Sequence, residues 1–181
     1  TEYAKILLLD TIGVALCSRK AAGPAMLLAS LEKMGTSAPQ ATLWGTRKKM
    51  RIADAVLYNA TLIHAQDYDD THVGGIVHPS ASVVSTALTV GEYIRAPGQD
   101  ILEAIIIGWE VIIRLALAAE GGFHEKGFHA TGILASFAAV CTAGRLLHVT
   151  PEVLTNALGL CGSQAGALQE FLHDGSWVKQ L

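Results

Sequence analysis

Hydrophobic residues recur every three or four positions along most of the chain, which is the spacing of one face of an α-helix. Two-residue alternation and Asn-Gly turns, which would indicate a sheet, are not found in the sequence. We therefore predict an all-α fold, with a single helical domain over residues 1–181. The expected helices cover residues 2–16, 25–34, 52–65, 80–94, 100–119, 130–147 and 151–165.

Turn-forming residues separate these helices. Gly23-Pro24 and Pro79 each stand where a helix is expected to begin. Thr150 should cap the last helix, because Pro151 fits the first helical turn. The segments without a helical period are expected at 41–44, which should be extended, and at 66–77, 120–128 and 169–180.

The segment 101–119 is the only candidate for a membrane span. It carries Glu103, Glu110 and Arg114, which lie on one face of a helix at 100° per residue. Charged residues are costly in lipid, so we expect this helix to pack within the protein and not in a membrane. Gly108, in its interior, should let a neighbouring helix approach closely.

The composition limits the partners and the compartment. The chain is 51% hydrophobic and only 16% charged, which excludes disorder and suggests surface that a partner or missing chain covers. A net charge of -3, without a long basic tract, argues against nucleic-acid binding. Cys17, Cys141 and Cys161 lie in apolar stretches without CxxC spacing, which is typical of buried thiols in the cytoplasm.

The densest group of chemically reactive side chains lies between His64 and Ser80, in the sequence HAQDYDDTHVGGIVHPS. Three carboxylates and three imidazoles occur within fifteen residues, and they are costly to bury unless they pair. One interpretation is a metal site, but neither an HExxH pair nor an EF-hand pattern is present, so no metal is expected. A second is an acid/base site, and a third is a solvated loop in which Asp69 or Asp70 merely caps backbone amides.

Two further segments carry candidate residues. His129, in KGFHATG, stands where a loop enters a helix, so its imidazole and the amides of the first turn could face an anion. Lys179 ends a polar stretch, HDGSWVK. Taken alone, each also has an ordinary explanation. His129 could be a helix cap or a core histidine, and Lys179 could be a surface charge.

Taken together, these motifs resemble the MmgE/PrpD family. The first two motifs in chain order are DYDDT, which begins at Asp67, and HPS, which begins at His78. They are followed by GWEVxxR from Gly108, GFHxTG from Gly127 and DGxxxK from Asp174. The family includes 2-methylcitrate dehydratase, cis-aconitate decarboxylase and iminodisuccinate epimerase. The resemblance extends over essentially the whole chain and does not single out one of these activities.

The resemblance implies a longer homodimeric protein, in which both ends of the chain build a helical domain and an α+β lid is inserted between them. This sequence would supply the first part of the helical domain without the lid. Asp67, His78, His129 and Lys179 match the family's active-site positions. The resemblance to the dehydratase would imply a tryptophan-containing loop between the aspartates and HPS, but residues 71–77 replace it here, which leaves the substrate open.

The resemblance thus leads us to expect a cofactor-independent lyase, a dehydratase or decarboxylase of a small di- or tricarboxylate. His78 would transfer the proton, oriented by Asp67, although His129 could exchange roles with it. The substrate's carboxylates would be bound by His129 and Lys179, together with Asp70 and Ser80. The alternatives are an epimerase of a small dicarboxylate and a non-catalytic helical fragment that serves dimerisation.

Overall fold

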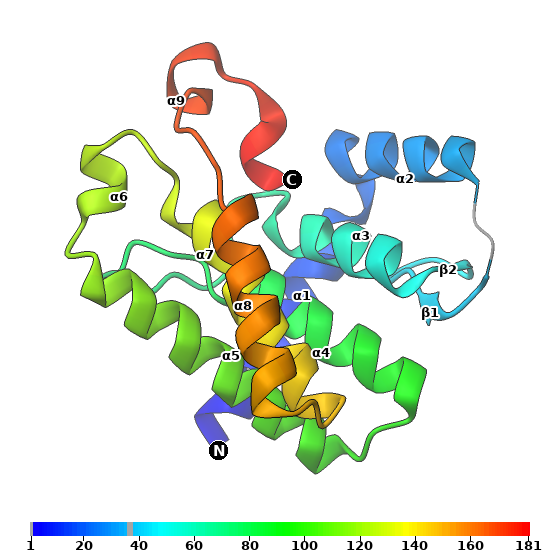
Figure 1. Ribbon diagram of the computed structural model, residues 1–181. Helices are drawn as coiled ribbons and strands as arrows, with labels where there is room; N and C mark the ends of the chain where they lie inside the picture. Colours follow the sequence, from blue (N-terminus) through cyan, green and yellow to red (C-terminus); the bar gives the residue numbers. More distant parts are fainter. Residues whose placement is uncertain (1, 36–37) are drawn as a thin grey trace.

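Helices make up most of the molecule, as Figure 1 shows. The computed structural model describes residues 2–35 and 38–181; residue 1 and residues 36–37, which the predicted domain includes, lie outside the described part. The all-α prediction is confirmed. The longer helices are α1 (Glu2–Cys17), α2 (Ala22–Met34), α3 (Ile52–His64), α4 (Ser80–Ile94), α5 (Gly98–Ala118), α7 (Ala130–Leu146) and α8 (Pro151–Gln164). The short ones are η1 (Ser18–Lys20), α6 (Gly122–Glu125), α9 (Phe171–Asp174) and η2 (Trp177–Gln180).

Helix α4 forms the centre of the core, between α3, α5 and α7. Val83 and Val84 of α4 are inaccessible to solvent, and so is Leu62 of α3. Gly108 allows α5 and α7 to approach closely, because a Cβ atom there would lie 2.2 Å from Oγ1 of Thr142 in α7. The prediction of close packing at Gly108 is therefore confirmed. Each large apolar side chain buried here stabilises the fold by about 1.5–3 kcal/mol.

A small antiparallel hairpin stands beside this core, formed by β1 (Ala41–Thr42) and β2 (Lys49–Met50). The extended segment at 41–44 was predicted, whereas its partner strand was not. Strands of two residues are too short to show the alternation by which a strand is recognised in sequence. The carboxylate of Glu92, in α4, fixes the hairpin by accepting hydrogen bonds from the amide and hydroxyl of Thr42 at 2.9 and 2.8 Å.

Most predicted helix limits agree with the structure to within three residues. Helix α2 begins at Ala22, which places Pro24 inside its first turn, where a missing N–H costs nothing. The cap of α8 is confirmed, since Oγ1 of Thr150 accepts a hydrogen bond from the amide of Val153. The short helices α6, α9 and η2 lie in segments that were predicted to be loops. None of the three contains a buried residue, so no apolar stripe marks them in the sequence.

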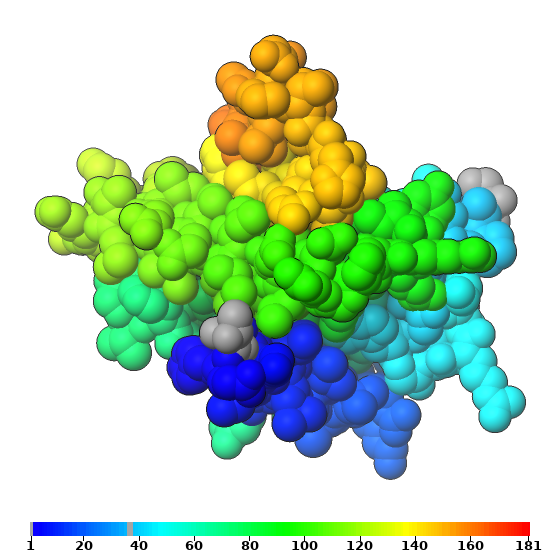
Figure 2. Space-filling model, turned by 90° about the horizontal axis from the view of Figure 1, so that it is seen from below, coloured from blue at the N-terminus to red at the C-terminus, as the bar shows by residue number. Residues whose placement is uncertain are grey.

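The C-terminal part of the chain lies outside the core. Figure 2 shows the end of α7 and α8 projecting from the body of the molecule, and Cys161 is the one buried residue of α8. The chain then returns as the C-terminal segment, residues 165–181, and passes the beginning of α7. There the amide of His129 donates to the carbonyl of Ala167 at 3.0 Å, and the amide of Gln169 donates to the carbonyl of Gly127 at 2.9 Å.

The three cysteines are free thiols. Cys161 is buried and Cys141 is partly buried, but Cys17 is exposed in the last turn of α1, so the prediction of buried thiols is wrong for that residue. Within residues 2–35 and 38–181, the structure contains no helix with the length and apolarity that a bilayer crossing requires.

Candidate active site

The turn that follows α3 carries two carboxylates that differ in their exposure to solvent. Asp67 has a left-handed backbone conformation, with φ at 53°, which aspartate tolerates better than most residues. Its side chain is 47% exposed, whereas the carboxylate of Asp69, two residues later, is inaccessible to solvent. Asp67 is therefore the outer carboxylate of the acidic sequence, and Asp69 is the inner one.

The inner carboxylate binds the histidine at the end of α3. Nδ1 of His64 lies 3.1 and 3.0 Å from the two carboxylate oxygens of Asp69. Both side chains are buried, and burial opposes the ionisation of Asp69. Hydrogen bonds from His64 and His78, with their positive charge, outweigh this effect and lower the pKa of Asp69 to about 2. Asp69 is therefore a carboxylate at neutral pH.

His78 returns to the same carboxylate because the loop before it is closed. The amide of His72 donates to the carbonyl of Val77 at 2.9 Å, and the amide of His78 donates to Oγ1 of Thr131, in α7, at 3.1 Å. These bonds place Nδ1 of His78 3.5 Å from Oδ1 of Asp69. Its Nε2 lies 3.5 Å from Oδ1 of Asp67. One imidazole thus stands between the inner and the outer carboxylate.

The remaining two predicted residues reach this cluster from distant parts of the chain. The ring of His129, at the beginning of α7, stacks on that of His64 with centroids 6.4 Å apart. The rings of Phe171 and His129 pack edge to face, with centroids 5.3 Å apart. Lys179, from the C-terminal segment, forms an ion pair with Asp67. The four predicted catalytic residues, Asp67, His78, His129 and Lys179, are thus brought together.

The surroundings give the two histidines different proton affinities. Burial disfavours protonated His78, but its hydrogen bond with Asp69 and the charges of Asp69 and Asp67 outweigh this and raise its pKa. Burial also disfavours protonated His129, and the positive charges of His64, Lys179 and His78 add to that effect, so its pKa falls to about 4. His129 is neutral at pH 7 and can donate one N–H, whereas the pKa of His78 is shifted in the opposite direction, which favours its protonated form.

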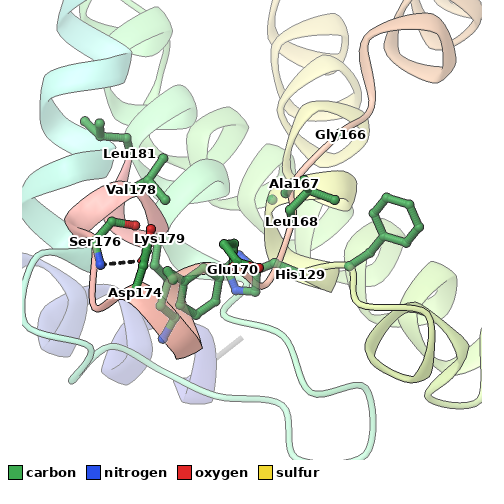
Figure 3. Close-up of a pocket in the computed structure, with 13 residues that line it drawn as sticks. His129, Gly166, Ala167, Leu168, Glu170, Asp174, Ser176, Val178, Lys179 and Leu181 are labelled. Atoms are coloured by element: carbon green, nitrogen blue, oxygen red, sulfur yellow. Dashed lines mark hydrogen bonds between the residues drawn. The ribbon is translucent and has the colours of Figure 1, made fainter.

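A cavity of about 600 Å³ lies against this cluster and shares His129 and Lys179 with it. Figure 3 shows that its wall comes mostly from the C-terminal segment, while His129 enters from the beginning of α7. Glu170 and Asp174 also line it and are exposed. A negatively charged ligand in the cavity would therefore be attracted by Lys179 and the His129 N–H and repelled by Glu170 and Asp174.

The comparison with known families decides where this site belongs. Residues 1–181 match the family described as MmgE/PrpD N-terminal domain. The chain belongs to the MmgE/PrpD family. Its site is thus built by the N-terminal domain of that family, from the end of α3, the loop before α4, the beginning of α7 and the C-terminal segment.

Curated relatives of this MmgE/PrpD chain carry names of one activity. It is 28% identical over 173 residues to the human protein named cis-aconitate decarboxylase, which is 92% of this chain and 35% of that protein. It is 27% identical over 143 residues to cis-aconitate decarboxylase of Aspergillus terreus, which is 76% of this chain and 29% of that protein. It is 29% identical over 130 residues to the cis-aconitate decarboxylase-like protein oryM of Aspergillus oryzae, or 67% of this chain and 27% of that protein. The chain spans about a third of the length of these relatives.

The two other predicted binding residues have structural partners in this MmgE/PrpD domain. The carboxylate of Asp70 accepts a hydrogen bond from the amide of Ser80 at 3.2 Å, at the first residue of α4. Burial raises the pKa of Asp70. The hydroxyl of Ser80 is buried and accepts a hydrogen bond from the indole of Trp109 at 3.0 Å. Asp70 therefore matches the third interpretation of the acidic loop, and substrate binding by either residue stays a prediction.

Sequence reasoning did not select His64 or Asp69, although both belong to the cluster. The available signal was their spacing: a histidine in the last turn of a helix, followed five residues later by an aspartate in the loop. His64, Asp67, Asp69 and His78 each offer a donor atom within 4.8 Å of the others, a separation that a bound cation could also use. The ammonium group of Lys179 already supplies a positive charge there, and the absence of a metal remains a prediction.

Proposed function

We propose that this MmgE/PrpD chain carries the proton-transfer and carboxylate-binding residues of a cofactor-independent lyase. Its substrate would be a small di- or tricarboxylate related to cis-aconitate. The observation that carries the proposal is the convergence of His78, Lys179 and His129 from three separate segments on one cluster. The names of the relatives supply the substrate class.

Carboxylate binding would fall to Lys179 and His129. The ammonium group of Lys179 now faces Asp67, and a substrate carboxylate would take the place of that partner. His129 is neutral at pH 7, so it would donate a single N–H, helped by the positive end of the helix that begins beside it. Both groups line the cavity, together with the carboxylates of Glu170 and Asp174.

Decarboxylation is the reaction that fits His78 best. The bond from carbon to the departing carboxylate breaks, CO2 leaves, and the electron pair stays on the carbon, where the remaining carboxylates delocalise it. Protonated His78 then gives its Nε2 proton to that carbon and regains one from water. A raised pKa keeps more of His78 in the protonated form that this step needs.

Dehydration would use the same atoms in the opposite order. Neutral His78 would remove a proton next to a carboxylate, and the hydroxyl on the neighbouring carbon would leave as water after taking up a proton. The raised pKa of His78 reduces the neutral fraction that must begin this reaction. We therefore place decarboxylation before dehydration.

The direct test is to incubate the purified intact protein with cis-aconitate and with citrate-like hydroxy acids in D2O, and to follow CO2 release and products by NMR. We expect CO2 release from the unsaturated acid and deuterium in its product. His78→Ala should lower kcat/KM at least ~10²-fold, as expected for loss of a general acid. His148→Ala removes a histidine in the turn between α7 and α8 and should leave turnover unchanged. Near-normal turnover by His78→Ala would overturn the assignment.

The alternatives give different results in the same assay. An epimerase would exchange deuterium at the carbon next to a carboxylate without releasing water or CO2. A non-catalytic fragment would show no turnover, and millimolar tricarboxylate would leave its melting temperature unchanged, because a ligand that binds only the folded state stabilises it.

We also propose a homodimer in the cytoplasm. Exposed apolar side chains on α1, among them Tyr3, Ile6 and Leu9, support a subunit contact. Light scattering that shows a 19.1 kDa monomer would contradict the dimer. The three free thiols support a reducing compartment, which fractionation of cells that express the protein would test.

A further inference from the structure

His64 is the most deeply buried histidine of the site, and the proposed reaction assigns it no role. It is 5% exposed, and its Nδ1 contacts both oxygens of Asp69. Within the described residues, its Nε2 is buried and has no hydrogen-bond partner. A buried imidazole with one unsatisfied nitrogen costs free energy, and the contacts of its other nitrogen with Asp69 must offset that cost.

Asp69 fixes which nitrogen of each imidazole carries a proton. An ionised carboxylate only accepts hydrogen bonds, so Nδ1 of His64 must donate to it in either charge state of the ring. Nδ1 of His78, 3.5 Å from the same carboxylate, also faces an acceptor. The hydroxyl of Thr71 lies 3.3 Å from Nδ1 of His78 and can donate to the carbonyl of Asp69, so its oxygen is a second acceptor. Nε2 of His78 lies at the same 3.5 Å from Oδ1 of Asp67, but that carboxylate is half-exposed and already paired with Lys179. In neutral His78 the buried Asp69 and Thr71 therefore favour the proton on Nδ1 and the lone pair on Nε2.

The carboxylate depends on His64 for this arrangement. His64 provides the two short side-chain contacts of Asp69, whereas the contact with His78 is longer. Without His64, a carboxylate with no exposed surface would have one distant imidazole to balance its charge. Such a buried group takes up a proton more readily or rotates away, and in both cases His78 loses its negatively charged neighbour.

We propose that His64 is a positioning residue: it holds the Asp69 carboxylate against Nδ1 of His78, so that Nε2 of His78 is the atom that exchanges protons with the substrate. The inference rests on the proposed function for the identity of the proton-transfer residue. The principle is that of a carboxylate that fixes the tautomer and orientation of a catalytic histidine. Here a second histidine in turn fixes the carboxylate.

The charged groups around His78 determine the sign of the expected change. Asp69, Asp67 and Asp70 face it from its own loop, His64 from α3, His129 from α7 and Lys179 from the C-terminal segment. If His64 is removed and Asp69 is neutralised or displaced, the imidazolium form of His78 loses a favourable charge while Lys179 stays. The titration midpoint of His78 should then move to lower pH.

The test compares three substitutions in the intact protein. His64→Leu removes the donor and keeps an apolar side chain of moderate size. His64→Asn places an amide N–H near the position of Nδ1 and should restore the contact with Asp69. His72→Asn is the matched control, because His72 lies in the same loop and its Nδ1 accepts from the amide of Gly75 instead. Circular dichroism verifies that each variant is folded, and His64→Gln replaces His64→Leu if the latter is not.

The first readout is independent of catalysis. NMR of 15N-labelled histidine side chains reports the tautomer and the titration midpoint of His78. We expect His64→Leu to lower the titration midpoint of His78. Thr71→Val removes the second acceptor, and in that background His64→Leu should also abolish the preference of His78 for a proton on Nδ1. His64→Asn and His72→Asn should resemble the wild type. An unchanged or raised midpoint in folded His64→Leu would overturn the proposal.

The second readout is the rate. His64→Leu should lower kcat by about 10- to 100-fold and leave KM almost unchanged, because His64 acts through another residue. The limb of the pH profile that reports His78 should shift to lower pH, and His64→Asn should recover most of the rate. A loss confined to KM would contradict a positioning role. If the wild type turns over none of the carboxylates, the proposed function fails, and the NMR titration still decides the role of His64.

Discussion

The two halves of the site differ in how the fold holds them. His64 and Asp69, the inner pair, are buried at the end of a core helix and bound to each other. In the outer pair, the half-exposed side chain of Asp67 binds Lys179 of the C-terminal segment. No described residue of that segment is buried. The inner pair contacts His78, and Lys179 of the outer pair lines the cavity.

This difference indicates a division of labour. Groups that tune a proton-transfer residue are most effective when they are already fixed before the substrate arrives. Groups that bind a substrate must exchange one partner for another, which is easier where solvent and a loosely packed segment are available. Substitutions and pH can test this contrast between the buried inner pair and the exposed outer pair.

The strongest test compares one leucine from each region. Leu62→Ala, in α3, should lower the free energy of unfolding by about 2–5 kcal/mol, because Leu62 is completely buried and the substitution leaves a cavity. Leu172→Ala, in α9, should change it by less than about 0.5 kcal/mol, since Leu172 is 67% exposed. Urea titration measures both. Similar losses would show that the C-terminal segment belongs to the same cooperative core.

The second test removes the charge of the outer pair. Lys179→Ala should lower kcat/KM by about 10²-fold, because the substrate carboxylate loses its cation. Its effect on stability should stay below about 1 kcal/mol, as is usual for a partly exposed ion pair. Lys126→Ala, which removes an exposed lysine from the loop before α7, is the control for total charge. Unchanged kinetics in Lys179→Ala would remove Lys179 from the site.

The third test uses pH on the inner pair. The folded-state pKa of Asp69 is about 2, below its ordinary value of 3.8, so its stabilisation is complete above that ordinary value and disappears as the pH falls toward 2. The difference amounts to about 2 kcal/mol. Asp69→Asn should therefore be less stable than the wild type at pH 6, and the gap should narrow toward pH 2. If the free energies of unfolding of Asp69→Asn and the wild type differed by the same amount from pH 6 to pH 2, the lowered pKa of Asp69 would be contradicted.

The smallest effect is expected where the C-terminal segment rests on α2. A Cβ atom on Gly23 would lie 2.0 Å from the ring of Trp177, two residues before Lys179. Gly23→Ala should displace that ring and with it Lys179, and lower kcat/KM about tenfold. Gly13→Ala, in α1, meets no atom within 4 Å. It should stabilise its helix by about 0.5–1 kcal/mol without changing turnover.

The helices could be predicted because their signals are local. Periodic apolar positions marked α3, α4, α5 and α7, Thr150 marked a cap, and Gly108 marked a close contact, and each of these was confirmed. The hairpin partner at 49–50 and the exposure of Cys17 could not be predicted in this way. Both depend on which elements happen to lie beside them in the folded chain.

The site shows the same division. Motif order identified Asp67, His78, His129 and Lys179, which the structure brings together. It could not separate Asp69 from Asp70, since neighbouring aspartates in one sequence motif differ only in the direction that the turn gives them. The turn sends Asp69 to two imidazoles and Asp70 to the amide of Ser80. The role of His64 depends on that direction and is therefore invisible in the sequence.

The ion pair between Asp67 and Lys179 joins residues 112 positions apart in the chain. A ribosome adds roughly 5–20 residues per second, so on the order of ten seconds separate the synthesis of the two side chains. During that interval the acidic loop and its imidazoles can already be folded against α3, while the cation that balances Asp67 does not yet exist. The nascent chain therefore carries the imidazoles and carboxylates of its site before it carries the ammonium group that would bind a substrate carboxylate.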